Sequence, residues 1–122
     1  MLVLNALFRC RTEEIPDIKD CDEDLEERIT TDNALCGLIF HPHEPGNPFM
    51  NCLANPLLNR PAFAENCLFD VCVLQDDSND MKQAACGNLE ALAAQCRTLG
   101  IVVDWRMAAD CRQYIELSQY EL

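Results

Sequence analysis

Residues 61–74 of this 122-residue chain read PAFAENCLFDVCVL, and the pattern predicts a helix with one buried face. Pro61 suits the first position of a helix, because a proline there leaves no backbone N–H unpaired. Apolar residues then recur at intervals of four, four and three, which places on one helical stripe Phe63, Cys67, Val71 and Leu74. We expect the helix to end at the Asp76-Asp77 pair, and Phe69 to lie in or near the core.

A second helix is predicted over residues 80–99, behind a loop and helix N-cap at residues 76–80, DDSND. Gly100 stands at the expected C-cap, where glycine accepts a left-handed backbone conformation. The inward residues at helical spacing are Met81, Ala85, Leu89, Leu92, Cys96 and Leu99. Residues 101–105, IVVDW, are rich in β-branched side chains and are expected to be extended.

The part of the chain that precedes residue 61 contains shorter and less regular elements. The acidic run at residues 20–28, DCDEDLEER, can form a short helix with Leu25 and Ile29 on its inner face. It lacks the alternating ligands and central glycine of an EF-hand loop, so we read it as a solvated acidic face. Residues 41–61 hold five of the six prolines, which favours turns and irregular backbone.

The charge balance excludes several partners. The chain has 21 acidic against 9 basic residues, a net charge of −12 and a pI near 4.3. It has no Lys/Arg cluster that could bind phosphates, so neither nucleic acid nor an anionic membrane surface is an expected partner. No apolar run reaches the about 20 residues of a spanning helix, so no membrane insertion is expected.

Nine cysteines are the most informative feature of the composition. Most follow one another at intervals of 10 to 16 residues, and they occupy positions 10, 21, 36, 52, 67, 72, 86, 96 and 111. A structural zinc site needs tightly spaced pairs, and only Cys67 and Cys72 approach that spacing. The spacing is typical of a disulfide framework made in an oxidising compartment. Eight paired cysteines allow 105 pairings, and Cys10, before the regular series, is the candidate for the odd thiol.

Two histidines at residues 41–44, HPHE, raise the possibility of a metal site or a catalytic base. Around a proline, His41 and His43 cannot both face one ion without a particular turn, and no third ligand is evident. A Cys/His pair with Cys36 is conceivable, but an oxidised framework leaves no thiolate to attack. We therefore predict no enzyme activity, no metal ion and no cofactor.

The order of these motifs resembles the C8 module, which follows a von Willebrand factor type D domain in large secreted glycoproteins. The resemblance covers about residues 21–111. It is carried by Cys36-Gly37-Leu38, Phe49 followed by Cys52, Glu65-Asn66-Cys67-Leu68-Phe69-Asp70-Val71-Cys72, Cys86 with Leu89 and Leu92, Ala93-Ala94-Gln95-Cys96, Gly100-Ile101-Val102-Val103-Asp104-Trp105-Arg106, and Cys111.

The resemblance implies a mainly α, small disulfide-rich domain with two principal helices, short helices and irregular loops. Residues 1–20 would be an N-terminal connector or the tail of a preceding module, residues 21–111 the C8-like domain, and residues 112–122 a C-terminal connector. Eight cysteines would form bridges within the module, namely Cys21, Cys36, Cys52, Cys67, Cys72, Cys86, Cys96 and Cys111. Cys10 would be unpaired or linked outside it, and Trp105 would anchor the core or a contact between modules.

The implied function is that of a secreted, extracellular structural and interaction module of matrix, mucus or adhesive glycoproteins such as von Willebrand factor, gel-forming mucins, zonadhesin and tectorins. Its partners would be neighbouring von Willebrand type D and trypsin-inhibitor-like modules, and other extracellular proteins. An extracellular module that binds a secreted protein such as a growth factor stays open as an alternative. The plant eight-cysteine lipid carriers need adjacent C-C and C-x-C motifs, which this chain lacks.

This sequence departs from many C8 modules at several points. It has Val73-Leu74 and Ala84-Ala85 where relatives carry extra cysteines that are associated in some of them with links between chains. Leu53 replaces a customary histidine, and no N-x-S/T sequon occurs. We therefore expect neither covalent multimerisation through this module nor N-glycosylation within this chain.

Overall fold

The computed structural model describes residues 21–111, and within them it is built from helices and loops without a strand. The helices in chain order are α2 (Glu23–Thr31), α3 (Gly37–Phe40), α4 (Met50–Leu53), α5 (Arg60–Cys72) and α6 (Ser78–Thr98). Two of them, α5 and α6, are long, and the others span four to nine residues. The predicted fold class, mainly α with two principal helices, is confirmed.

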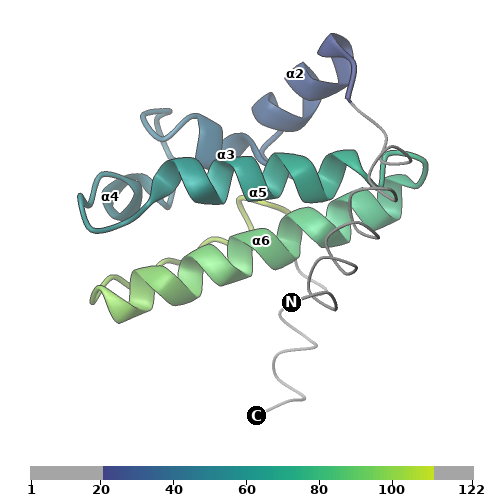
Figure 1. The fold of residues 1–122 in the computed structure, drawn as a ribbon. Helices are drawn as coiled ribbons and strands as arrows, with labels where there is room; N and C mark the ends of the chain where they lie inside the picture. The colour runs from purple at the N-terminus through teal and green to yellow at the C-terminus, as the bar shows by residue number, and fades with distance from the viewer. Residues whose placement is uncertain (1–20, 112–122) are drawn as a thin grey trace, which may run out of the picture.

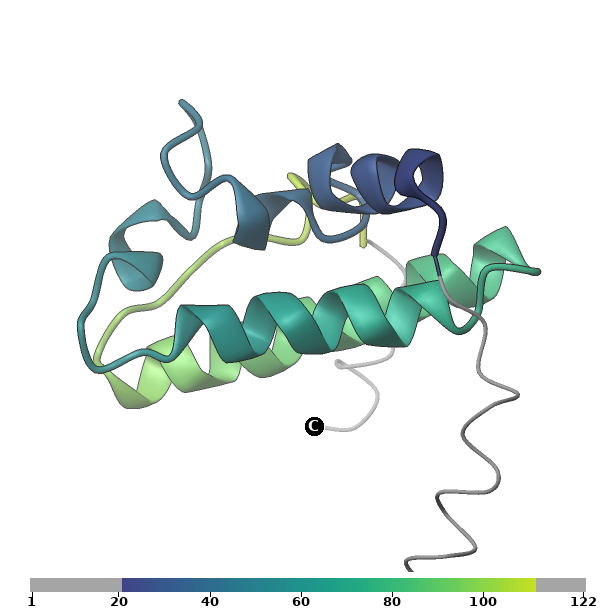
Figure 2. The ribbon, with the colours of Figure 1, turned by 45° about the horizontal axis from the view of Figure 1, so that its top comes forward.

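The two long helices form one layer of the domain. They are joined by a short turn, run in opposite directions and lie side by side (Figure 1). Figure 2 shows the second layer above this pair, made by α2, α3, α4 and the returning segment 101–111. The three short elements and this segment therefore cover one face of the α5–α6 pair.

Side-chain caps set where the long helices begin. Asn59 precedes α5, and its Oδ1 accepts a hydrogen bond from the Ala62 N–H at 3.2 Å, with Pro61 in the first turn. The Oδ1 of Asp77 accepts from the N–H groups of Asn79 and Asp80 at 2.9 and 3.3 Å, and α6 begins at the next residue. These caps satisfy backbone donors that have no partner inside a helix. At the other end of α6 the C-cap is Leu99, one residue before the position predicted, and Gly100 directly after it has the left-handed φ of +85° that glycine accepts.

The core lies between the two layers. Its largest fully buried side chains come from every element and include Trp105, Phe49, Ile29, Ile39, Leu89, Leu92 and Val71. On α6, Met81, Ala85, Leu89, Leu92 and Cys96 are buried as predicted, and Leu99 is partly buried against the core. On α2, Ile29 is fully buried and Leu25 partly buried, so the predicted inner face of that helix is confirmed.

Two apolar residues of the opening stretch were wrongly predicted to be inside. Phe69 is 53 % exposed and Leu74 is 39 % exposed. Phe69 lies about 160° around the helix axis from Val71, at 100° per residue, so it points to the face opposite the core. Leu74 lies beyond the end of α5, which stops at Cys72 and not at the acidic pair. The helical stripe was correct only as far as Val71.

A glycine permits the sharp passage from α2 into α3. The N–H of Gly37 donates to the carbonyl oxygen of Asp32 at 2.9 Å. A Cβ atom at this position would lie 2.8 Å from the Asp32 carbonyl carbon and 2.9 Å from that of Thr31. Real Cβ atoms do not approach backbone so closely, so glycine is needed here for the close contact.

Candidate functional site

Four disulfides connect the two layers of the domain. They pair Cys21 with Cys72, Cys36 with Cys67, Cys52 with Cys96, and Cys86 with Cys111. All eight residues named from the sequence as bridging cysteines therefore lie in bonds within residues 21–111. The Cα–Cα distances of 5.7 to 6.0 Å are ordinary for disulfides.

Each long helix contributes two of these cysteines, and no bridge joins α5 to α6. On α5, Cys67 binds the residue that precedes α3, and Cys72 binds the residue before the N-cap of α2. On α6, Cys96 binds α4 and Cys86 binds the C-terminal segment at Cys111. The α5–α6 pair is thus held by packing and its turn, while the bridges fasten the covering layer onto it.

Trp105 is the largest side chain of the core. It is 1 % exposed, and its ring centroid lies 6.1 Å from that of Phe49, next to α4. The guanidinium carbon of Arg106 lies 4.9 Å from the Trp105 ring, and its Nη2 lies 3.5 Å from Oε1 of Glu90 on α6. Of the two roles predicted for Trp105, the structure shows the core role. An anchor toward another module would need a surface that this buried ring does not offer.

Lys82 joins three parts of the fold, a role that the sequence analysis missed. From α6, its Nζ donates to the carbonyl oxygens of Ala34 at 3.2 Å, between α2 and α3, and of Ala109, near the end of the described chain. Desolvation by burial lowers the pKa of Lys82 below its usual 10.5, partly opposed by the charges of Asp110 and Asp32. A lysine that belongs to no motif gives no sequence signal for such a role.

Asn47 organises the proline-rich loop, and it too was missed. It is 7 % exposed, and its Nδ2 donates to the carbonyl oxygens of Leu38 at 2.8 Å and His41 at 3.0 Å. Its Oδ1 accepts from the Phe49 N–H at 2.8 Å. The side chain therefore fastens the loop between α3 and α4 to both helices. Its place between a glycine and a proline was the available signal, because asparagine often bonds nearby backbone in such turns.

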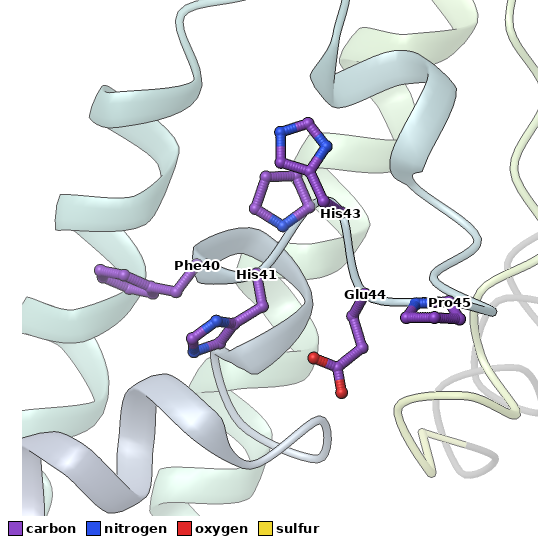
Figure 3. A pocket seen from close by; sticks show the side chains of 6 residues that line it. Phe40, His41, His43, Glu44 and Pro45 are labelled. Carbon is purple, nitrogen blue, oxygen red and sulfur yellow. The ribbon is translucent and has the colours of Figure 1, made fainter.

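An open hollow of about 380 Å³ lies over this loop. It is lined by residues 40–45, and Figure 3 shows that the rings of His41 and His43 point in different directions from the backbone. Both histidines and Glu44 are exposed. Among residues 21–111, no three His, Cys, Asp or Glu side chains are grouped as a metal ion would require. The geometry of the hollow therefore does not gather ligands around one point.

Cys10 and the predicted connectors, residues 1–20 and 112–122, lie outside the described residues. Within residues 21–111, no helix combines the length and the hydrophobicity that crossing a lipid bilayer requires.

Comparison with known proteins places this framework among related sequences. The family model described as the C8 domain matches residues 35–112. Alpha-tectorin of Mus musculus is 26 % identical over 110 residues, which are 89 % of this chain and 5 % of that protein. Alpha-tectorin of Homo sapiens is 24 % identical over 119 residues, 97 % of this chain and 5 % of that protein.

The human IgGFc-binding protein is 35 % identical over 78 residues, which are 63 % of this chain and 1 % of that protein. No solved structure matches the chain significantly. The chain thus spans a twentieth or less of the length of these relatives, so it corresponds to one small part of each.

Proposed function

Because the chain belongs to the C8 domain family, as the resemblance in its sequence predicted, we propose that it is a structural and interaction module of a secreted, multimodular extracellular glycoprotein. It packs against neighbouring modules and performs no catalysis. The observation that carries this proposal is the set of four bridges. Each part of the covering layer is bonded to α5 or α6, either directly or through a cysteine next to it in sequence.

The oxidation state of the cysteines supports an extracellular location. Bridges of this number persist in oxidising compartments and are rare where glutathione keeps thiols reduced. Six of the eight bonded cysteines are at most 3 % exposed, so their sulfur atoms belong to the core and not to a reactive surface. With all eight bonded, the described residues present no thiolate nucleophile.

The surface of the domain supports contact with other modules. Within residues 21–111, five large apolar side chains are exposed, namely Leu57, Phe69, Leu74, Val102 and Met107. Contacts between modules of one chain typically bury surfaces of mixed polarity, to which such side chains contribute. The neighbours would be modules of the von Willebrand type D and trypsin-inhibitor-like kinds, which the family resemblance implies.

The test of this proposal is where the natural polypeptide is found, and how large it is. An antibody raised against the 122-residue chain would be used to probe cells and their medium after full reduction. We expect a product in the medium, distinctly larger than the 13.8 kDa of this chain, because further modules accompany it. A product confined to the cytosol, with thiols that alkylate without prior reduction, would overturn the proposal.

A further inference from the structure

The four bridges differ in their access to solvent. Cys36, Cys67, Cys52 and Cys96 are 0 % exposed, and Cys86 and Cys111 are 3 % and 2 % exposed. Cys72 is 8 % exposed, and its partner Cys21 is only partly buried. Thiol–disulfide exchange requires a thiolate to reach one sulfur atom of the bond, so access selects the bridge that reacts. The Cys21–Cys72 bond is therefore the one open to attack.

We propose that the Cys21–Cys72 bridge is a site of covalent attachment, at which a cysteine thiol of a partner protein, set in basic surroundings, exchanges with the bridge while the domain stays folded. The incoming thiolate attacks Sγ of Cys21 and forms a mixed disulfide with it. The bond between Cys21 and Cys72 breaks, and its electron pair leaves on Sγ of Cys72, which takes up a proton. One disulfide is exchanged for another, so no oxidant or reductant is consumed. This site does not depend on the module role proposed above.

The neighbourhood of the bridge fits attack at Cys21. Cys21 is the more exposed partner, whereas Cys72 is held at the last turn of α5. The side-chain amide Nε2 of Gln75 lies 3.9 Å from Sγ of Cys72 and donates to the Cys72 carbonyl oxygen at 3.1 Å. An N–H beside the departing sulfur stabilises its negative charge, because hydrogen bonding to the charged form favours that form.

Charge around the bridge selects the partner. Residues 22–24 directly follow Cys21 and read DED, and the loop after Cys72 carries the acidic pair at residues 76–77. All five of these side chains are exposed, and neither residues 21–27 nor residues 69–81 contain a lysine or arginine. The nearest cations in sequence are Lys19, which lies outside the described residues, and Arg28 on α2, while Lys82 is committed to two backbone carbonyls. An anionic thiolate is repelled here, whereas a thiol flanked by basic groups is attracted.

Nesting of the bridges explains how the domain can stay folded after exchange. The Cys36–Cys67 bridge lies inside the loop that Cys21 and Cys72 close, and it still ties the segment after α2 to α5. With that inner bridge intact, opening the outer one frees a ring of only about 20 residues, those between 21 and 36 and between 67 and 72. Ile29 of α2 lies within this ring and is fully buried, so packing also holds α2 in place.

The first test identifies the bridge and the sulfur atom. The full chain is treated with limiting cysteamine, quenched with acid, alkylated and mapped by mass spectrometry. We expect the first product to carry cysteamine on Cys21 and the alkyl group on Cys72, with the other three bridges intact and the helical circular dichroism unchanged. First opening of any other bridge, cysteamine on Cys72, or loss of helix with the first exchange would each overturn the proposal.

The second test measures selection by charge. The rate of opening of the Cys21–Cys72 bridge is measured with a cationic thiol, cysteamine, and with an anionic one, 3-mercaptopropionate. Each rate is divided by the thiolate concentration and by the rate of the same thiol with a neutral reference disulfide. We expect cysteamine to be faster by roughly tenfold at low salt, and the ratio to approach one at about 1 M salt, where charges are screened within about 3 Å. A ratio near one at low salt would contradict selection of a basic partner.

Two variants complete the design. The pair Glu23→Gln and Asp24→Asn removes two charges beside the bridge and should lower the cysteamine preference severalfold. The matched pair Glu44→Gln and Asp104→Asn removes the same charge from other exposed positions and should leave the preference nearly unchanged. If both pairs lowered the cysteamine preference equally, the net charge of the chain alone would set that preference, and a local site would be refuted. A Cys10→Ser variant must react as the parent chain does, because loss of exchange there would make Cys10 the attacking thiol.

Discussion

Removal of the Cys52–Cys96 bridge should be the most destabilising loss of a disulfide in this domain. Cys52→Ala together with Cys96→Ala avoids leaving a buried free thiol, and the bridge closes a loop with a sequence separation of 44. In the chain-entropy model, opening a loop of that length lowers the free energy of unfolding by about 4 kcal/mol. The other three bridges provide no shorter path between the two positions, so the full effect is expected.

The Cys21–Cys72 bridge provides the matched comparison. Its sequence separation is 51, which alone would suggest a slightly larger loss. Because the Cys36–Cys67 bridge lies inside the loop, the ring that is actually released has about 20 residues, and the expected loss is about 3 kcal/mol. The double variant Cys21→Ala and Cys72→Ala should therefore lose less stability than the double variant that lacks the Cys52–Cys96 bridge, although the latter bridge has the smaller sequence separation.

Urea unfolding without reductant measures both losses. Trp105 is the single tryptophan of the chain and lies against Phe49 beside α4, which the Cys52–Cys96 bridge holds on α6. Its fluorescence therefore reports the affected region directly. At a slope of about 2 kcal/mol per molar urea, a loss of 4 kcal/mol lowers the midpoint by about 2 M. An unchanged midpoint, or a larger loss for the Cys21–Cys72 pair, would refute the ring argument.

Three further substitutions test other parts of the structure. Trp105→Ala should lower the free energy of unfolding by about 3 to 5 kcal/mol, because it empties the largest buried volume of the core; calorimetry of the oxidised chain checks this. Gly37→Ala should lower the free energy of unfolding by about 3 kcal/mol, because the added Cβ clashes with backbone. Gly100→Ala should lower it by about 1 kcal/mol, because φ is positive there but the space is open. Equal urea midpoints for the two variants would contradict the close contact at Gly37. Lys82→Met should cost about 1 to 3 kcal/mol near pH 7, because two carbonyl oxygens lose a charged donor. The pKa of Lys82 is lower in the folded state than its usual 10.5, so the parent chain gains stability as the pH rises toward 10.5. The difference in free energy of unfolding between the parent chain and Lys82→Met should therefore widen over that range. A difference that narrows would refute the assigned direction of the pKa shift.

Local patterns in the sequence were sufficient to find the two long helices and most of their buried faces. Capping side chains and helical periodicity act over a few residues, so the N-cap within residues 76–80 and the glycine at the end of α6 could be predicted without a structure. The same reasoning failed at Phe69 and Leu74, because burial depends on whether another element covers that side of the helix. Hydrophobicity alone cannot report that.

The contacts made by Lys82 and Asn47 could not be anticipated in the same way. Lys82 lies 48 residues from Ala34 and 27 from Ala109 in sequence, and the three meet only because α6 passes under both segments. Asn47 reaches Leu38 and His41 across a loop whose path its own bonds help to set. Such bonds join groups whose proximity is a result of folding.

The amino-acid sequence by itself determined a helical, cysteine-rich domain of the C8 family, since helix periodicity, capping residues and the order of cysteines and motifs are properties of the linear chain. It left 105 ways to pair eight cysteines. Only the tertiary structure selected one of them, because a disulfide forms where two Cα atoms come within about 6 Å in the right orientation, and packing of the short helices on the α5–α6 pair decides which cysteines meet that condition.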